Sequence, residues 1–218
     1  MRIKGILFDC DGVLLDSEAI YINSLMDYLS TLGIETNLED VVNVLGQKMP
    51  CIIKTLRVKF SLENYTDEEL ITGQREIFDQ KFNQMNLQPM PYLLEFLKWC
   101  KLKQLKTAIV SSSNMNYLKN VVNRLQIHNY FDEVFSGEMV KNSKPAPDIY
   151  LFAAKEMNIP RKNLLIIEDS INGIKAGKNS KIFTVGYKGS IIEQDTSDAD
   201  LEVRSFEDIK HFLELDIL

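Results

Sequence analysis

Hydrophobic positions along the chain first form short uninterrupted runs. Runs without polar alternation indicate a sheet covered on both faces, which is typical of parallel α/β architecture. Shorter apolar stretches at 134–135 and 201–203 are expected to add edge strands. The four main runs, each followed by a polar residue or glycine, are Ile6–Phe8 before Asp9, Ala108–Val110 before Ser111, Leu164–Ile167 before Glu168 and Ile182–Val185 before Gly186.

Helical periodicity separates these runs from residue 92 onward. Apolar residues at helical spacing predict helices over 92–103 and 114–125. Pro147 is expected just inside the start of a further helix, where its missing N–H needs no partner. Ser205 predicts the N-terminal cap of a last helix. The alternation of strands and helices predicts a doubly wound, parallel, Rossmann-like α/β core.

Residues 17–86 interrupt this alternation because they contain no convincing strand. Their apolar spacing and capping signals predict helices instead. We therefore expect an all-helical domain, residues 17–86, inserted into an α/β core made of residues 1–16 and 87–218. The expected helices cover 22–32 followed by Gly33, 41–45 followed by Gly46, 52–60, and a segment that opens with a capping box from Thr66 to Glu69.

Composition narrows the function classes. The 218 residues include 25 Lys and Arg against 31 Asp and Glu, which gives a formal net charge of -6. Unspecific nucleic-acid binding depends on basic residues that neutralise phosphates, so this balance disfavours it. Apolar runs fall far short of the ~18 residues of a membrane helix. Three distant cysteines, Cys10, Cys51 and Cys100, indicate reduced thiols. We expect a cytoplasmic monomer with no nucleic-acid or membrane partner.

The candidate chemistry rests on carboxylates, hydroxyls and lysine. The only histidines, His128 and His211, lie far from any Ser or Cys in a nucleophile context, which disfavours a Ser-His-Asp triad and a His-rich zinc site. Open α/β sheets bind ligands at the carboxyl ends of their strands. Crowded carboxylates there need a cation, and an all-oxygen site suits Mg²⁺. The residues expected at those ends are Asp9, Asp11, Ser111, Glu168 and Asp169.

The segment Asp9-Cys10-Asp11-Gly12 is the sharpest of these signals. An aspartate at a strand tip can act as a nucleophile and form an aspartyl-phosphate. The second aspartate returns to the same side of the extended chain and can exchange protons with the leaving group. Gly12 permits a sharp turn, but it falls too early for an EF-hand calcium loop. The alternative interpretation is a solvent-facing acidic turn, and this motif alone leaves both open.

Four spaced motifs together resemble the haloacid dehalogenase (HAD) superfamily. They occur in the family's order, and the helical insertion resembles its cap domain. The segment 144–148, Lys-Pro-Ala-Pro-Asp, is typical of the β-phosphoglucomutase-like branch, which includes sugar phosphatases. The matching motifs are residues 9–17, Ser111 after its strand, Lys144-Pro145, and Glu168-Asp169 with Ser170, Gly173 and Ile174.

The resemblance implies a role for each acidic residue. Asp9 would attack phosphorus, and Asp11 would protonate the leaving oxygen and then activate water. Mg²⁺ would be held by the Asp9 carboxylate, the Asp11 main-chain carbonyl and Asp169. Glu168 would bind the ion directly or through water. The metal would screen the attack of one anion on another.

The resemblance also implies a phosphate-binding set, Ser111, Ser112 and Lys144, placed where charge develops. Lys144 is further expected to pair with Asp9 and keep it ionised.

Taken one at a time, the same residues have simpler interpretations. Ser111 alone would be a helix cap, shared with Ser112 or Ser113. Lys144 alone would be a solvated surface lysine. Glu168-Asp169 alone would be an acidic helix start favoured by the helix dipole. Asp16 and Ser17 are interpreted as turn and cap residues that orient Asp11.

The helical domain departs from the mutase pattern. Tyr21 stands where the mutases carry a His, and Met49 stands where they carry an Arg that holds the distal phosphate. Gly46 is retained, and Lys48 or Arg75 is a candidate replacement for the arginine, with an ordinary surface position as the alternative. Because a mutase must hold a second phosphate, these departures favour hydrolysis.

The leading hypothesis is a Mg²⁺-dependent phosphatase that acts on a small phosphorylated metabolite, a sugar or sugar-acid phosphate. The first alternative is a β-phosphoglucomutase-type phosphoryl transfer. The second is a non-catalytic protein that binds phosphorylated metabolites.

Overall fold

The computed structural model describes residues 2–41, 44 and 49–216. The chain divides into two compact units, which are described separately below. The core unit consists of residues 1–16 and 87–218, and the helical unit consists of residues 17–86. Within the described part of the chain, no helix combines the length and apolarity needed to cross a membrane.

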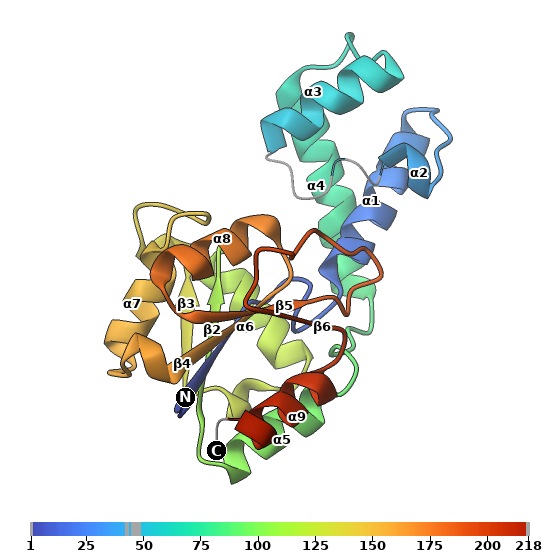
Figure 1. Ribbon diagram of the computed structural model, residues 1–218. Coiled ribbons are helices and arrows are strands. Elements are labelled where there is room, and N and C mark those ends of the chain that lie inside the picture. Colours follow the sequence, from blue (N-terminus) through green and yellow to red (C-terminus); the bar gives the residue numbers. More distant parts are fainter. Residues whose placement is uncertain (1, 42–43, 45–48, 217–218) are drawn as a thin grey trace. The chain divides into compact units, whose positions relative to one another are not determined.

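The core unit is built on a six-stranded parallel sheet with the order β3-β2-β1-β4-β5-β6 (Figure 1). The order reverses at β1, which pairs with β2 on one side and β4 on the other. This reversal defines a doubly wound fold, and ligands bind such sheets at the switch point. The strands are β1 (Gly5–Phe8), β2 (Lys106–Ser111), β3 (Glu133–Ser136), β4 (Leu164–Glu168), β5 (Phe183–Tyr187) and β6 (Leu201–Val203).

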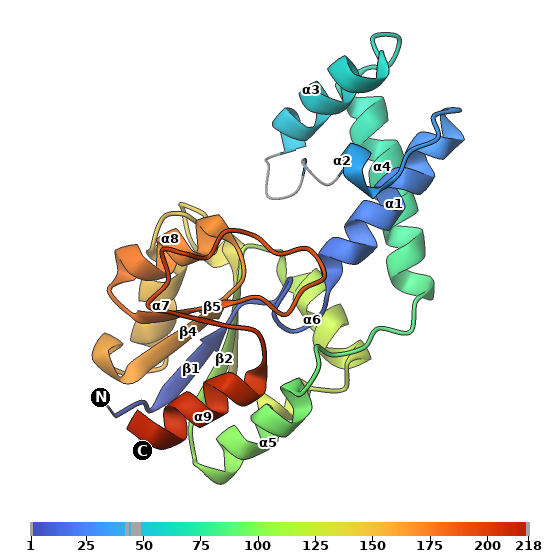
Figure 2. The ribbon, with the colours of Figure 1, turned by 45° about the vertical axis from the view of Figure 1, so that its right-hand side comes forward.

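Helices cover both faces of this sheet. Right-handed crossovers place α5 and α6 on one face and α7 and α8 on the other, and α9 lies beside α5 (Figures 1 and 2). The helices are α5 (Leu93–Leu102), α6 (Met115–Arg124), α7 (Asp148–Glu156), α8 (Ile171–Ser180) and α9 (Phe206–Asp216), with 3₁₀ turns at His128–Tyr130, Gly137–Met139 and Arg161–Asn163.

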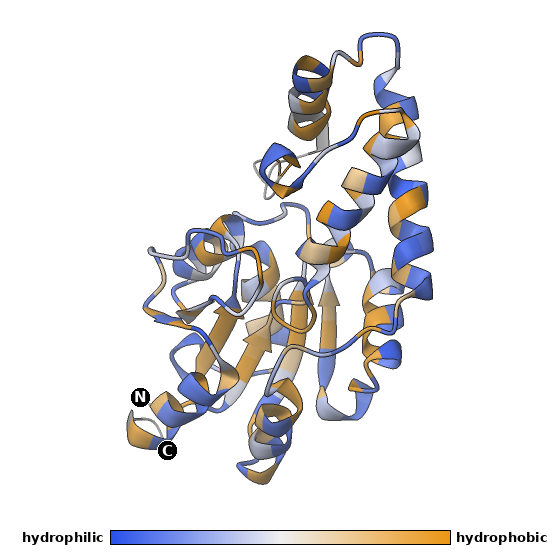
Figure 3. Cartoon of the chain, turned by 90° about the vertical axis from the view of Figure 1, so that its right-hand side faces the viewer, coloured by the Kyte–Doolittle hydropathy of each residue, from blue (hydrophilic) through white to orange (hydrophobic). Residues whose placement is uncertain are grey.

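Successive strand side chains pack on opposite faces, as the uninterrupted apolar runs predict. Leu7 belongs to a buried cluster with Tyr150 and Ala153 of α7. Phe8 faces the other way, and its ring centroid lies 6.0 Å from that of Phe96 on α5. The apolar colouring of the strands in Figure 3 reflects this two-sided burial. The doubly wound parallel fold predicted from the sequence is therefore confirmed.

Two predicted boundaries in the core unit are wrong. The strand expected to end before Gly186 continues through it to Tyr187, because Gly186 stays paired between Glu168 and Glu202. Pro147 precedes α7 as its cap residue and does not lie inside the first turn.

The helical unit contains α1 (Ser17–Thr31), α2 (Leu38–Val41), α3 (Met49–Phe60) and α4 (Asp67–Gln84). Helices α1 and α4 pack together, and the Tyr28 hydroxyl of α1 donates to the Glu69 carbonyl of α4 at 3.3 Å. The predicted capping box at Thr66 is confirmed. Gly33, the predicted cap after α1, has φ of +80°, a conformation that favours glycine.

The short second helix begins earlier than predicted, and residues 42, 43 and 45 of the predicted segment lie outside the described residues. We expected it at 41–45, but α2 spans Leu38–Val41. Asn37 fixes this start, because its side chain accepts from the Asp40 N–H at 3.2 Å while the Asp40 carboxylate accepts from the Asn37 N–H at 3.1 Å. The predicted C-terminal glycine of this helix, Gly46, lies outside the described residues.

Candidate active site

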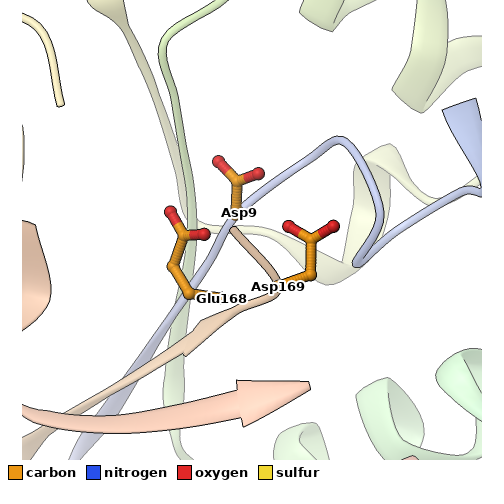
Figure 4. Close-up of side chains that lie close together, drawn as sticks. All are labelled: Asp9, Glu168 and Asp169. Carbon is orange, nitrogen blue, oxygen red and sulfur yellow. The ribbon is translucent and has the colours of Figure 1, made fainter. Parts of the chain in front are cut away.

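Neighbouring parallel strands bring three acidic side chains to one edge of the sheet. Asp9 follows β1 and Glu168 ends β4, and the Asp9 N–H donates to the Ile167 carbonyl at 2.9 Å. Asp169 is the next residue along the chain. The carboxyl groups stand together beyond the strand ends (Figure 4), with one oxygen of each within 4.8 Å of the others. All three residues are buried.

Lys144 connects two of these carboxylates. Its Nζ lies 2.6 Å from Asp9 Oδ1 and 2.6 Å from Glu168 Oε1, and it also donates to the Val110 carbonyl at 3.0 Å. The lysine side chain is only 6% exposed. The alternative of a solvated surface lysine is therefore wrong. Its ammonium supplies positive charge beside the three clustered carboxylates, Asp9, Glu168 and Asp169, which are called the acidic group below.

Glu168 is held by donors on both of its oxygens. Oε1 accepts from Lys144 and, at 2.7 Å, from the Tyr150 hydroxyl. Oε2 accepts from the N–H and the hydroxyl of Ser170 at 3.3 and 3.1 Å. A Cβ on Gly173 would lie 1.8 Å from the Glu168 Cδ, so glycine makes room for this carboxylate. Glu168 is therefore not the acidic helix start of the simpler interpretation; Ser170 caps α8 instead.

The charge balance at this edge of the sheet favours a bound cation. Burial and the charge of Glu168 raise the pKa of Asp9 to about 8, although Lys144 lowers it. The pairing expected between Lys144 and Asp9 is present, and it lowers the pKa of Asp9 against the larger effect of burial. The donor set is three carboxylates, of which two, those of Asp9 and Glu168, contact the one ammonium group. Hard, oxygen-only donors of this kind fit Mg²⁺.

Asp11 lies on the loop after β1 and has different partners. Its Oδ1 accepts from the Tyr117 hydroxyl at 2.6 Å, and its Oδ2 accepts from the Ser113 hydroxyl at 3.1 Å. Gly12 turns this loop with φ of +73°, and a Cβ there would lie 1.7 Å from Asp169 Oδ2. Both the backbone conformation and the close approach therefore require glycine.

Ser111 ends β2 at the same edge and is 2% exposed. Its hydroxyl oxygen accepts from the Ser113 N–H at 3.1 Å. The cap of the following helix is Asn114, whose side chain accepts from the Tyr117 N–H at 2.9 Å. The helix-cap alternative for Ser111 is therefore wrong. Ser112, the other predicted phosphate-binding serine, is exposed.

Comparison with known proteins identifies the family of this chain. A model of the haloacid dehalogenase-like hydrolase family matches residues 6–187. The chain belongs to this family. The resemblance seen in the four motifs is thus confirmed.

Two relatives and one solved structure show what this chain is similar to. A phosphorylated carbohydrates phosphatase from Thermotoga maritima is 29% identical over 83% of this chain and 82% of its own length. A 6-phosphogluconate phosphatase from Escherichia coli is 27% identical over 81% and 78%. The crystal structure of a β-phosphoglucomutase from Clostridium difficile has a TM-score of 0.74, 24% identity, and coverage of 98% and 96%. This last likeness shows the fold alone.

The helical unit of this hydrolase carries the predicted substrate residues. The Tyr21 hydroxyl is buried and has no hydrogen-bond partner among the described residues, and burial raises its pKa to about 12. The Arg75 side chain is 76% exposed and lies 3.9 Å from Asp79, one turn along α4. Gly46 and Lys48 lie outside the described residues.

Sequence reasoning missed two aromatic residues of the core unit. Tyr117 and Tyr150 donate to Asp11 and Glu168, yet each sits on a helix where an aromatic residue is expected to fill the core. Asp16 also has an unpredicted partner. Its carboxylate accepts from the Ser190 hydroxyl and the Ile191 N–H, both at 3.0 Å, and so holds the segment that follows β5.

Proposed function

We propose that this chain is a Mg²⁺-dependent phosphatase that hydrolyses a small phosphorylated metabolite through an aspartyl-phosphate on Asp9. The observation that carries this proposal is the buried Asp9 carboxylate, whose Oδ1 lies 2.6 Å from Lys144 Nζ. The second aspartate of the same loop, Asp11, is hydrogen-bonded to other side chains and is separate from this pair. A sugar or sugar-acid phosphate is the substrate class we favour. The names of the Thermotoga and Escherichia relatives support that class.

Each core residue has a distinct task in the proposed reaction. The Asp9 carboxylate attacks phosphorus, and the Lys144 ammonium offsets charge on the transferring phosphoryl group. Ser111 and Ser112 provide hydrogen bonds to the same group. Asp11 protonates the departing oxygen and then takes a proton from the water that releases phosphate. The net reaction converts a phosphate monoester and water into an alcohol and inorganic phosphate.

The acidic group would hold the metal ion of this reaction. Asp9, Asp169 and the main-chain carbonyl of Asp11 are the proposed direct ligands. Glu168 is assigned contact through water, since its oxygens already accept four hydrogen bonds. When bound, Mg²⁺ supplies the positive charge that lets an anionic nucleophile approach an anionic phosphate.

The helical unit is proposed to act as a cap that selects the substrate. Its candidate contacts are Tyr21, Gly46, Lys48 and Arg75. Closure of a cap over the core would exclude bulk water from the aspartyl-phosphate. Small-angle scattering with and without a phosphate mimic tests this role, and identical profiles would argue against closure.

A screen of phosphorylated metabolites with Mg²⁺ tests the proposed reaction. We expect phosphate release that stops with chelator and in Asp9→Asn. Conversion of β-glucose 1-phosphate to glucose 6-phosphate without phosphate release would establish the mutase instead. If the protein binds sugar phosphates but turns over no compound, the alternative of a non-catalytic protein that binds phosphorylated metabolites is favoured.

A further inference from the structure

Two hydroxyl groups hold the Asp11 carboxylate, one on each oxygen. The Tyr117 hydroxyl donates to Oδ1 at 2.6 Å and the Ser113 hydroxyl donates to Oδ2 at 3.1 Å. Among the described residues, the acidic group with oxygens within 4.8 Å of one another is Asp9, Glu168 and Asp169, and Asp11 is outside it. The Asp11 carboxylate is thus bonded at the start of α6 and is not one of the three clustered carboxylates.

This separation matters for proton transfer. A carboxylate bound to a cation is a poor base, because the cation occupies the electron pair that would accept the proton. A general acid and base must also keep its reactive oxygen at a defined position, since rates fall steeply with small displacements. Hydrogen-bond donors on both oxygens fix the rotation of the carboxylate. A hydrogen bond to an ionised acceptor is also stronger than one between neutral groups.

The start of α6 fixes both donors. The Asn114 side chain caps this helix by accepting from the Tyr117 N–H at 2.9 Å, which holds Tyr117 in the first turn. The Ser113 N–H donates to the Ser111 hydroxyl oxygen at 3.1 Å, and the Ser113 carbonyl accepts from the Ser136 hydroxyl at 2.9 Å. The donors that reach Asp11 therefore stand on a backbone secured to β2 and β3.

We propose that Tyr117 is a positioning residue, assisted by Ser113, that places the Asp11 carboxylate for proton transfer. The inference rests on the proposed phosphatase reaction and adds two residues to it. Tyr117 acts through Asp11 and contacts no reacting atom in this assignment. Because the 2.6 Å bond from Tyr117 is the shorter of the two, Tyr117 contributes more than Ser113.

Leaving groups of different basicity separate positioning from a general structural effect. An alkyl phosphate needs a proton on its departing oxygen, whereas p-nitrophenyl phosphate releases a stable anion that needs none. In Tyr117→Phe, the first turnover of an alkyl phosphate should slow by about tenfold or more, the loss expected for one hydrogen bond to a charged group. The first turnover of p-nitrophenyl phosphate should stay within about twofold of wild type.

Rapid-quench kinetics gives a second signature. Hydrolysis of the aspartyl-phosphate still needs Asp11 as a base, so Tyr117→Phe should release one equivalent of p-nitrophenol in a burst and then turn over slowly. Ser113→Ala should show the same pattern with a smaller effect. Tyr130→Phe is the matched control. Tyr130 lies near the opposite edge of the sheet, where its carbonyl accepts from the Thr107 hydroxyl at the start of β2, and its variant should behave as wild type.

The outcomes distinguish this inference from the proposed function. If wild type shows no Mg²⁺-dependent phosphate release, or Asp9→Asn retains it, the proposed function fails and the inference fails with it. If wild type is active and Tyr117→Phe loses the same factor with both leaving groups, or changes neither, the positioning role alone is overturned. Thermal unfolding of Tyr117→Phe identifies any loss that comes from a destabilised fold.

Discussion

Replacing Gly173 with alanine tests how closely α8 is fitted to the acidic group. Alanine is favoured over glycine in helices by up to about 1 kcal/mol, so helix propensity alone predicts a more stable protein. The structure predicts the opposite. The added Cβ would lie 1.8 Å from the Glu168 Cδ and 1.9 and 2.0 Å from its two oxygens. The carboxylate must therefore move by more than about 1 Å to reach ordinary van der Waals separation.

Such a shift breaks the bonds that hold Glu168. Its donors, Lys144, Tyr150 and Ser170, lie between 2.6 and 3.3 Å from the carboxylate oxygens. Separating a buried charge from its partners costs about 3–5 kcal/mol. Subtracting the helix-propensity gain leaves a loss of roughly 2–4 kcal/mol in the free energy of unfolding. For a chain of this length that loss lowers Tm by roughly 4–16 °C.

Urea and thermal unfolding in the presence of chelator measure this loss. Asn172→Ala, at an exposed neighbouring position of α8, is the control for helix propensity. In a Glu168→Ala background the carboxylate is absent, so Gly173→Ala should there be neutral within about 0.5 kcal/mol or stabilising. If Gly173→Ala alone is as stable as wild type, the reasoning is refuted. An equal loss of stability from Gly173→Ala in the wild-type and Glu168→Ala backgrounds would refute it as well.

Three further predictions concern the same group of residues. Tyr150→Phe removes the donor 2.7 Å from Glu168 Oε1 while both residues stay fully buried, so the free energy of unfolding should fall by about 1–3 kcal/mol; an unchanged urea midpoint would contradict this. The raised pKa of Asp9 predicts a pH dependence: between its ordinary value of 3.8 and about 8 the folded protein holds a proton that the unfolded chain releases. The stability of the metal-free protein relative to Asp9→Asn should therefore fall as pH rises through that window and level off above it. For the same reason Mg²⁺ binding at pH 7 should release protons, and calorimetry in two buffers of different ionisation enthalpy should detect them; equal heats in both buffers would argue against a raised pKa.

The strand pattern predicts most of the core unit because burial on both faces leaves no polar positions in a strand. Asp9, Ser111 and Glu168 follow from the same logic, since each stands where such a run ends and parallel strands end at one edge. Gly12 and Gly173 belong to the motifs, but their tasks beside Asp169 and Glu168 depend on contacts across the fold.

Other parts of the site depend on contacts between residues far apart in the sequence, which a local sequence pattern does not reveal. Tyr117 meets Asp11 across 106 residues of sequence, and Lys144 meets Asp9 across 135. A helical tyrosine resembles a core residue until the partner of its hydroxyl is known. A lone lysine gives no sign of burial, so Lys144 and its pairing with Asp9 were predicted only through the family resemblance. The start of α2 was missed for a different reason, because the Asn37 cap outweighs a weak apolar spacing.

Direct detection of a phosphorylated Asp9 is the most decisive measurement. In Asp11→Asn the base for hydrolysis is missing, so an intermediate formed from p-nitrophenyl phosphate, whose leaving group needs no proton, should accumulate. Acid quench followed by peptide mass spectrometry should then locate one phosphoryl group on Asp9 in a Mg²⁺-dependent manner. Turnover of the same compound by wild type with no phosphoryl group on Asp9 of the variant, or with the group on another residue, would contradict the account.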